Sequence, residues 1–361
     1  MQKPGCDSNI QVDLIRVAAV LGVLLLHSAE DLTTQTMSSL EIWRWCIVDV
    51  YQSIGRMGVP LFVMLTGALL LSPSKKDEDL GFFFKKRFSR IGLPFIFWGV
   101  LYFIWDVFVE NQPVTQVFIL DGLLKGPYFT FWYLYMLVGL YLATPLLRVI
   151  VANASEKLMK YFLSVWFVGT AIVPLIPFAT SLIYSSSYSL DANVFVIPQY
   201  VGYFVLGAYL VNVRVTNRKL LGVILALGIA LTAIGTYAIA MTVGGGTTFF
   251  FQEYISPTLI MSAVPFFLLL NSHKSVPHTT AAKPSWIKRF MHLISENTLP
   301  IFLFHMIVIY TLQHGLLGVT LNGDVVNSIV GVPLMVFVTL GLCLLVIVPL
   351  KRIPVVKKLV G

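Results

Sequence analysis

Residues 12–31 read VDLIRVAAVLGVLLLHSAED, an apolar run that contains one arginine and one histidine. Its length predicts a helix that crosses a lipid bilayer. Arg16 and His27 are eleven positions apart, which is about 20° from three full helical turns, so both side chains lie on one helix face about 16 Å apart. Ionisable side chains are costly in lipid, and their presence in a span indicates a functional site. We therefore expect a cation near one membrane surface and a base near the other.

The composition of the whole chain is that of a polytopic membrane protein. Of its 361 residues, 57% are hydrophobic and 12% are charged, and the mean hydropathy is +0.83, whereas soluble proteins carry about 25% charged residues. The net charge of +8 is typical of basic cytoplasmic loops, so nucleic acid is not an expected partner. The three cysteines are far apart, so neither a disulfide framework nor a metal site is expected.

Ten apolar segments are long enough to cross the membrane as helices, which predicts an all-α fold. Their ranges are 12–30, 47–72, 91–109, 129–150, 159–177, 197–213, 220–242, 254–271, 295–315 and 328–350. The first run lacks a small-residue cleavage site, so we expect it to be retained as a span. With no internal repeat and no appended soluble segment in the sequence, we expect a single transmembrane domain over residues 1–361.

The distribution of positive charge predicts the orientation of these spans. If the N-terminus is cytoplasmic and the spans alternate, all of the 25 Lys and Arg residues except Arg44, Arg56 and Lys125 fall on the cytoplasmic side. An excess of Lys and Arg marks cytoplasmic loops. The sequence therefore predicts that both the N-terminus and the C-terminus are cytoplasmic.

The polar residues of the first span allow more than one role. Asp13 precedes Arg16 by one turn and can pair with it, although Arg16 can also extend toward the headgroups for structural reasons. His27 is suited to proton transfer near neutral pH. Glu30 and Asp31 follow His27 by three and four residues, where either can orient the imidazole or simply lie in a solvated loop.

Later segments hold further candidates. Lys86, Arg87 and Arg90 lie in a basic loop, which suits phosphate binding and equally suits contact with anionic lipid. His305 falls in the middle of a predicted span and should face the bundle or a cavity. Glu296, beside Ser295, begins that span, where a serine can cap the helix and an acid suits its positive end.

Two more sets of polar and aromatic residues lie in predicted spans. Trp132 belongs to an aromatic cluster, FTFWYLY at 129–135, that is typical of an interfacial belt and can also line a substrate entrance. Asp49 and Arg56, toward the outer end of the second span, are expected to face the same cavity as His305.

In chain order, these motifs resemble those of the acyltransferase-3 family of integral-membrane acyltransferases. They are DLIR at 13–16 followed by His27, GVPLFVMLTG at 58–67, RFSRIGLP at 87–94, WYLY at 132–135 with Tyr141 and Pro145, and the segment from Ser295 to His305. The sequence departs from the family pattern at Thr66, where serine is usual. No fused extracytoplasmic domain is seen, although some relatives have one.

The resemblance implies a plasma-membrane enzyme that moves an acyl group, usually acetyl, from cytoplasmic acyl-CoA to a hydroxyl of an extracytoplasmic or lipid-linked glycan. Acyl-CoA is then a co-substrate, and no bound cofactor is expected. His27 becomes a general base or a transient acyl carrier, and Arg16 holds the donor or stabilises charge on the thioester oxygen. Arg87 and Arg90, with the neighbouring Lys86, become ligands of the CoA phosphates.

Two other classes of function remain open from the sequence. A glycan or lipid transporter would also use intramembrane Arg and His, as a proton relay. Such transporters usually contain inverted repeats with broken helices, which the sequence does not display. A purely structural or sensory membrane protein would leave Arg16, His27 and His305 without a role.

Overall fold

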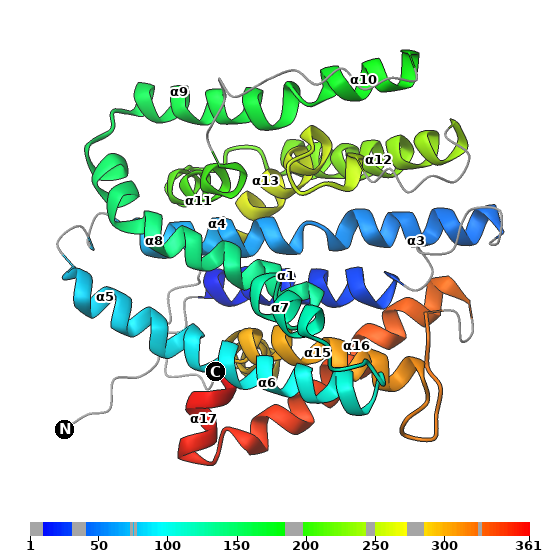
Figure 1. The fold of residues 1–361 in the computed structure, drawn as a ribbon. Helices are drawn as coiled ribbons and strands as arrows, with labels where there is room; N and C mark the ends of the chain where they lie inside the picture. The colour runs from blue at the N-terminus through cyan, green and yellow to red at the C-terminus, as the bar shows by residue number, and fades with distance from the viewer. Residues whose placement is uncertain are drawn as a thin grey trace.

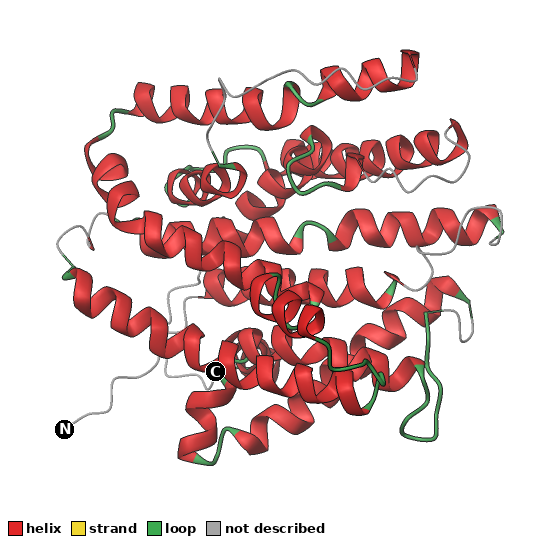
Figure 2. Cartoon of the chain, viewed as in Figure 1, coloured by secondary structure: helices red, strands yellow, loops and turns green. Residues whose placement is uncertain are grey.

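The protein is a bundle of helices (Figures 1 and 2). The computed structural model describes residues 10–30, 41–72, 75, 78–184, 198–242, 250–272, 285–323 and 327–361, and every regular element within them is a helix. The longer elements are α1 (Ile10–Ser28), α3 (Ile42–Gly55), α4 (Gly58–Leu70), α5 (Leu80–Arg87), α6 (Leu93–Phe108), α7 (Gln116–Leu124), α8 (Trp132–Asn153), α9 (Glu156–Phe167), α10 (Leu175–Tyr184), α11 (Gln199–Leu210), α12 (Arg218–Thr242), α13 (Pro257–Asn271), α14 (Trp286–Glu296), α15 (Thr298–Gln313), α16 (Ser328–Leu350) and α17 (Pro354–Val360). Short π or 3-10 segments are η2 (Phe88–Gly92), η3 (Phe129–Phe131), η4 (Val168–Ile172) and η6 (Phe250–Gln252).

The all-helical membrane fold expected from the sequence is confirmed. Among the described residues, 8 helical stretches are long and apolar enough to cross a bilayer, or up to 9 if the bent pair α14–α15 forms one span. The predicted segment 197–213, the sixth in chain order, is not among these stretches. It contains α11, which has 12 residues. Most of α11 is buried against α4, α8 and α9, so its apolar sequence reflects packing inside the bundle.

Helix α1 lies in the middle of the bundle (Figure 1). It contacts α3, α4, α13, α14, α15 and α16. Small residues allow this close packing: the Cα of Gly58 lies 3.2 Å from the position that a Cβ on Gly22 would occupy. Because α1 is enclosed by other helices, its ionisable side chains lie inside protein, where partners can offset the cost of their burial.

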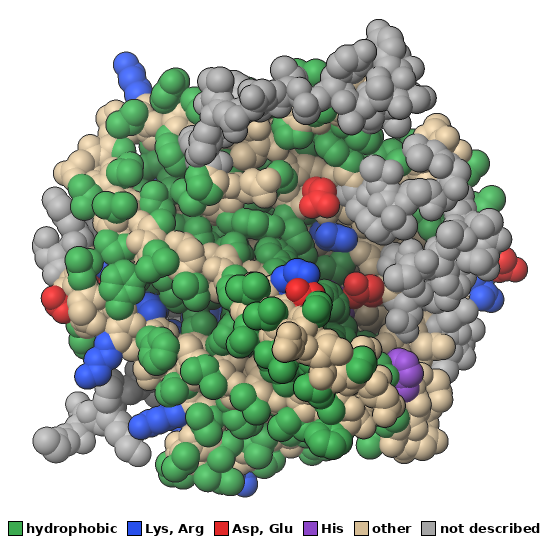
Figure 3. Space-filling model, viewed as in Figure 1, with side chains coloured by type: hydrophobic (Ala, Val, Ile, Leu, Met, Phe, Trp, Pro, Cys, Tyr) green, Lys and Arg blue, Asp and Glu red, His purple; other side chains and the backbone are tan. Residues whose placement is uncertain are grey.

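The surface has the polarity expected of a protein embedded in lipid. In Figure 3 most of the visible side chains are hydrophobic, and several of the Lys and Arg side chains lie toward the left of the view. Figure 1 places α5 and α17 on that side. Figure 1 also shows α1 beginning on that side. The basic end of the molecule is therefore the end at which α1 begins.

The contact between α4 and α11 depends on two glycines. A Cβ on Gly207 would lie 1.9 Å from the carbonyl oxygen of Met64, and one on Gly67 would lie 1.8 Å from that of Phe204. We predict that Gly207→Ala lowers the thermal stability of the detergent-purified protein, because the helices must separate, at a cost of about 1–3 kcal/mol. Gly139→Ala is the matched control, since nothing lies within 4 Å of its Cβ. Equal melting temperatures for the two variants would show that α4 and α11 do not pack this way.

Candidate active site

A cavity of about 290 Å³ near the basic end is lined by five cationic side chains. They are Arg16, Lys75, Lys86, Arg87 and Arg90, and none of the described residues that line the cavity is acidic. Away from the cations the wall is apolar and aromatic, and includes Phe62, Leu65, Leu137, Tyr133 and Phe302. Four of the five cations were candidates from the sequence, and the structure brings all four together. The cavity thus combines a site for several negative charges with an apolar extension.

Arg87 and Arg90 reach the same cavity from a continuous helical stretch. Arg87 ends α5, and Arg90 lies in the π-helical segment η2, a type of segment that is often found at functional sites. The Arg87 guanidinium lies 5.3 Å from the ring centre of Phe83 and 5.8 Å from that of Tyr141. Its Nε is buried and has no hydrogen-bond partner among the described residues. Aromatic rings therefore fix the guanidinium while leaving a donor for an oxyanion.

A buried ion pair anchors the segment between α4 and α5. Arg148 of α8 is 3% exposed. Its Nη2 lies 2.7 Å from Oε2 of Glu78, and its Nε donates to the Leu70 carbonyl at 2.8 Å. The pair spans 70 positions of sequence, which explains why the sequence did not reveal it. These contacts hold both sides of Lys75, whose Nζ donates to the Leu69 carbonyl.

The environment of Lys75 is electropositive. Its pKa is lowered from the usual lysine value by burial and by repulsion from Arg87 and Arg148. From the sequence, Lys75 is predicted only to be one of the many cytoplasmic Lys and Arg residues. Its position on the cavity wall adds a fifth cation to the phosphate-binding candidates.

Arg16 and Asp13 interact electrostatically with each other, as their spacing predicted, and both also contact α14. The Nη1 of Arg16 donates to the Ser295 hydroxyl at 3.5 Å, whereas Oδ2 of Asp13 lies 3.1 Å from Nδ1 of His292. Asp13 is buried, and its carboxylate lies near both His292 and Arg16. No sequence pattern indicated His292, because its contact with Asp13 depends on how α14 packs against α1.

The chain bends by 77° between α14 and α15, which changes the roles expected for Ser295 and Glu296. Both residues lie in the last turn of α14, and α15 begins only at Thr298. Ser295 therefore does not cap a span, and its buried hydroxyl faces Arg16. Glu296 is largely exposed, lies 3.3 Å from Nε2 of His292, and does not line the cavity.

At the other end of α1, His27 forms a pair with His305 of α15. The two ring centres are 5.2 Å apart. Nδ1 of His27 lies 2.7 Å from Oε2 of Glu30, so Glu30 does orient the imidazole, while Asp31 lies outside the described residues. His305 is fully buried and Nδ1 donates to the Phe302 carbonyl at 2.6 Å. Its Nε2 has no partner in the described structure.

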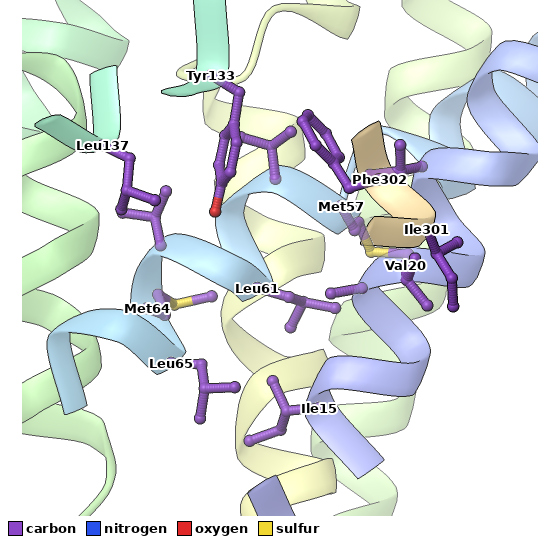
Figure 4. Close-up of a cluster of buried hydrophobic side chains, with 14 of the residues drawn as sticks. Ile15, Val20, Met57, Leu61, Met64, Leu65, Tyr133, Leu137, Ile301 and Phe302 are labelled. Carbon is purple, nitrogen blue, oxygen red and sulfur yellow. The ribbon is translucent and has the colours of Figure 1, made fainter. Parts of the chain in front are cut away.

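One layer of aromatic rings separates the cavity from the histidine pair. Phe302 and Tyr133 line the cavity, and their ring centres are 5.0 Å apart. Figure 4 shows the two side chains converging from α15 and α8 above Met57 and Leu61. On its other side, Phe302 lies 5.8 Å from His305. Phe302 thus lies between the cavity that Arg16 lines and the histidine pair, which does not line that cavity. One continuous slot shared by Arg16 and His27 stays a prediction.

The remaining candidates from the sequence, Trp132, Arg56 and Asp49, contact residues of the segments around α11 and η6. Trp132 packs against Tyr200 at 5.7 Å and Tyr254 at 5.5 Å between ring centres, and it does not line the basic cavity. Arg56 lies over the Tyr254 ring at 5.4 Å. Asp49 accepts a hydrogen bond from Gln252 at 2.6 Å. Asp49 and Arg56 thus contact the region where η6 leads into α13, and their expected position beside His305 stays a prediction.

The arrangement supports transfer chemistry between two kinds of ligand. An anion with an apolar arm fits the basic cavity, and a base fixed by a carboxylate lies beyond its inner end. Among the described residues, no group of three or more His, Cys, Asp or Glu is placed to hold a metal ion.

Comparison with known proteins bears on the chemistry. A family model described as an acyltransferase domain matches residues 9–348, which include every site residue named above. None of the curated proteins or solved structures compared with the chain matches it.

Proposed function

Because the chain belongs to the acyltransferase-3 family and is a membrane acyltransferase, we propose that it moves an acetyl group from cytoplasmic acetyl-CoA to a hydroxyl of an extracytoplasmic or lipid-linked glycan. The basic cavity carries this proposal, since its described wall holds five cations and no acid, which suits a donor with three phosphate groups. The apolar wall suits its pantetheine arm. A transporter would not need such a site at one end of the bundle.

The proposed reaction uses Nε2 of His27. Glu30 accepts the hydrogen bond from Nδ1–H, which leaves Nε2 free to take a proton and stabilises the resulting imidazolium. The acceptor hydroxyl gives its proton to Nε2 as its oxygen attacks the thioester carbonyl. The new C–O bond forms, the C–S bond breaks, and the proton passes to the sulfur of CoA, which leaves as the thiol. In the alternative route, Nε2 itself carries the acyl group before the hydroxyl takes it.

We place the basic cavity on the cytoplasmic side of the plasma membrane, together with both chain termini. The positive-inside rule supports this orientation. Arg16 then lies at the donor end, where it either binds the donor or stabilises negative charge on the thioester oxygen. The acceptor approaches from the end that holds His27.

The test is transfer of label from acetyl-CoA. Membranes from cells that produce the protein should incorporate acetyl label into a lipid-linked or polysaccharide fraction as a base-labile ester. Membranes with the His27→Ala variant should not. Glycan that crosses the membrane without acquiring label would favour the transporter function instead.

We predict a characteristic pH dependence for donor binding. The phosphates of the donor favour the protonated form of Lys75. The affinity for the donor is therefore highest below the pKa that Lys75 has in the free protein, and it falls as the pH rises above that pKa. Because that pKa lies below the usual lysine value, the loss should begin at a lower pH than for an ordinary lysine. Calorimetry with acetyl-CoA should show it for the wild type and not for Lys75→Gln. The same pH profile for both proteins would remove Lys75 from the donor site.

A further inference from the structure

The aromatic layer between the cavity and His27 bears on which acyl group the enzyme accepts. Phe302 is 5% exposed and Tyr133 is 7% exposed, so both rings are packed on nearly all sides. Tyr133 also contacts Phe62, with 6.2 Å between ring centres. Neither His27 nor His305 lines the cavity. As the structure stands, a donor in the cavity meets these rings before it meets the base.

The acyl group is the leading end of the donor. With its phosphates at the cations, the pantetheine arm points along α1 toward His27, about 16 Å from Arg16. The thioester has to come within hydrogen-bonding distance of the hydroxyl that His27 activates. The acyl group must therefore pass Phe302 and Tyr133 before the thioester can react.

We propose that Phe302 and Tyr133 form a constriction that selects short acyl groups, which rests on the proposed function. An acetyl group puts only one methyl ahead of the thioester, so the rings open for little more than the pantetheine arm that follows it. A longer chain needs them displaced over its whole length. Phe302 has little room to move, because Tyr133 lies on one side and His305 on the other. Its backbone is held as well, since its carbonyl accepts the hydrogen bond from His305.

The experiment compares chain-length profiles. Release of CoA thiol from acetyl-, butyryl-, hexanoyl- and octanoyl-CoA is measured for wild type, Phe302→Ala and the milder Phe302→Leu. We expect wild type to prefer acetyl-CoA, and Phe302→Ala to raise the octanoyl-to-acetyl ratio of kcat/KM by about tenfold or more. Phe302→Trp, which enlarges the ring at the constriction, should slow release from every donor. Phe304→Ala is the control, because Phe304 packs on Trp98 at 5.3 Å and should leave the ratio unchanged.

The outcomes separate this inference from the proposed function. If wild type consumes octanoyl-CoA as readily as acetyl-CoA, the constriction does not select. An unchanged ratio in folded Phe302→Leu, with acetyl-CoA still consumed, would also reject it and leave the acyltransferase assignment intact. A folded wild type that neither binds nor consumes any of the four donors would overturn both.

Discussion

His27→Ala should abolish acyl transfer while the protein remains inserted and folded. His27 is held by Glu30 at 2.7 Å, an arrangement that leaves Nε2 for the substrate. Its side chain is only 12% exposed, so the melting temperature is needed to separate loss of the base from loss of packing. Loss of a general base lowers rates by about 10²–10⁴-fold. Transfer of label from acetyl-CoA, measured beside the melting temperature of the purified variant, checks this.

Two further variants sharpen the test of His27. His314→Ala removes an exposed histidine that stacks on Tyr310 at 3.8 Å, far along α15 from the cavity, and should transfer at the wild-type rate. Glu30→Gln keeps a hydrogen-bond acceptor for Nδ1–H and removes the charge that stabilises the imidazolium, so it should lose part of the activity. A well-folded His27→Ala protein with near-normal transfer would exclude His27 as the base and as the acyl carrier.

The sequence predicted the membrane-spanning elements well where an apolar run ends in polar residues. The predicted span 328–350 coincides with α16, and 12–30 differs by two residues at each end from α1. It was less informative where the chain bends or a helix is short. Hydropathy is an average over a window, so it does not reveal the bend at Asn297. Nor does it reveal that α11 is short and largely buried.

The site divides in the same way between local and long-range features. Spacing in the sequence places Arg87 and Arg90 close together on one helical segment, and Arg16 lies on another. The structure brings the two segments to the same cavity. The contacts of His292 with Asp13, and of Arg148 with Glu78, join residues far apart in the chain. No periodicity encodes such pairs, because they depend on the packing of whole helices. The contact of Phe302 with Tyr133 is also a tertiary feature. The sequence does not reveal it, because α15 contains many apolar residues that look alike in sequence.

Arg87→Ala combined with Arg90→Ala should weaken acetyl-CoA binding and raise its KM. Hydrogen bonds to a charged group contribute about 1.5–3 kcal/mol, so loss of both side chains should raise the Kd by at least about 10- to 100-fold. Arg87 matters more, because it is 9% exposed and its Nε is unpaired in the described structure. Calorimetry on the detergent-purified protein measures the Kd directly, without knowledge of the acceptor.

The matched control for this pair removes the same charge from outside the cavity. Lys85 and Arg289 are exposed and do not line the cavity, so Lys85→Ala with Arg289→Ala should leave the Kd unchanged. If both double variants bind equally weakly, the effect is that of net charge alone. If both bind like wild type, Arg87 and Arg90 face anionic lipid, and the donor phosphates must rely on Arg16, Lys75 and Lys86. Only a loss confined to the Arg87 and Arg90 pair shows that the cavity recognises the donor through these arginines.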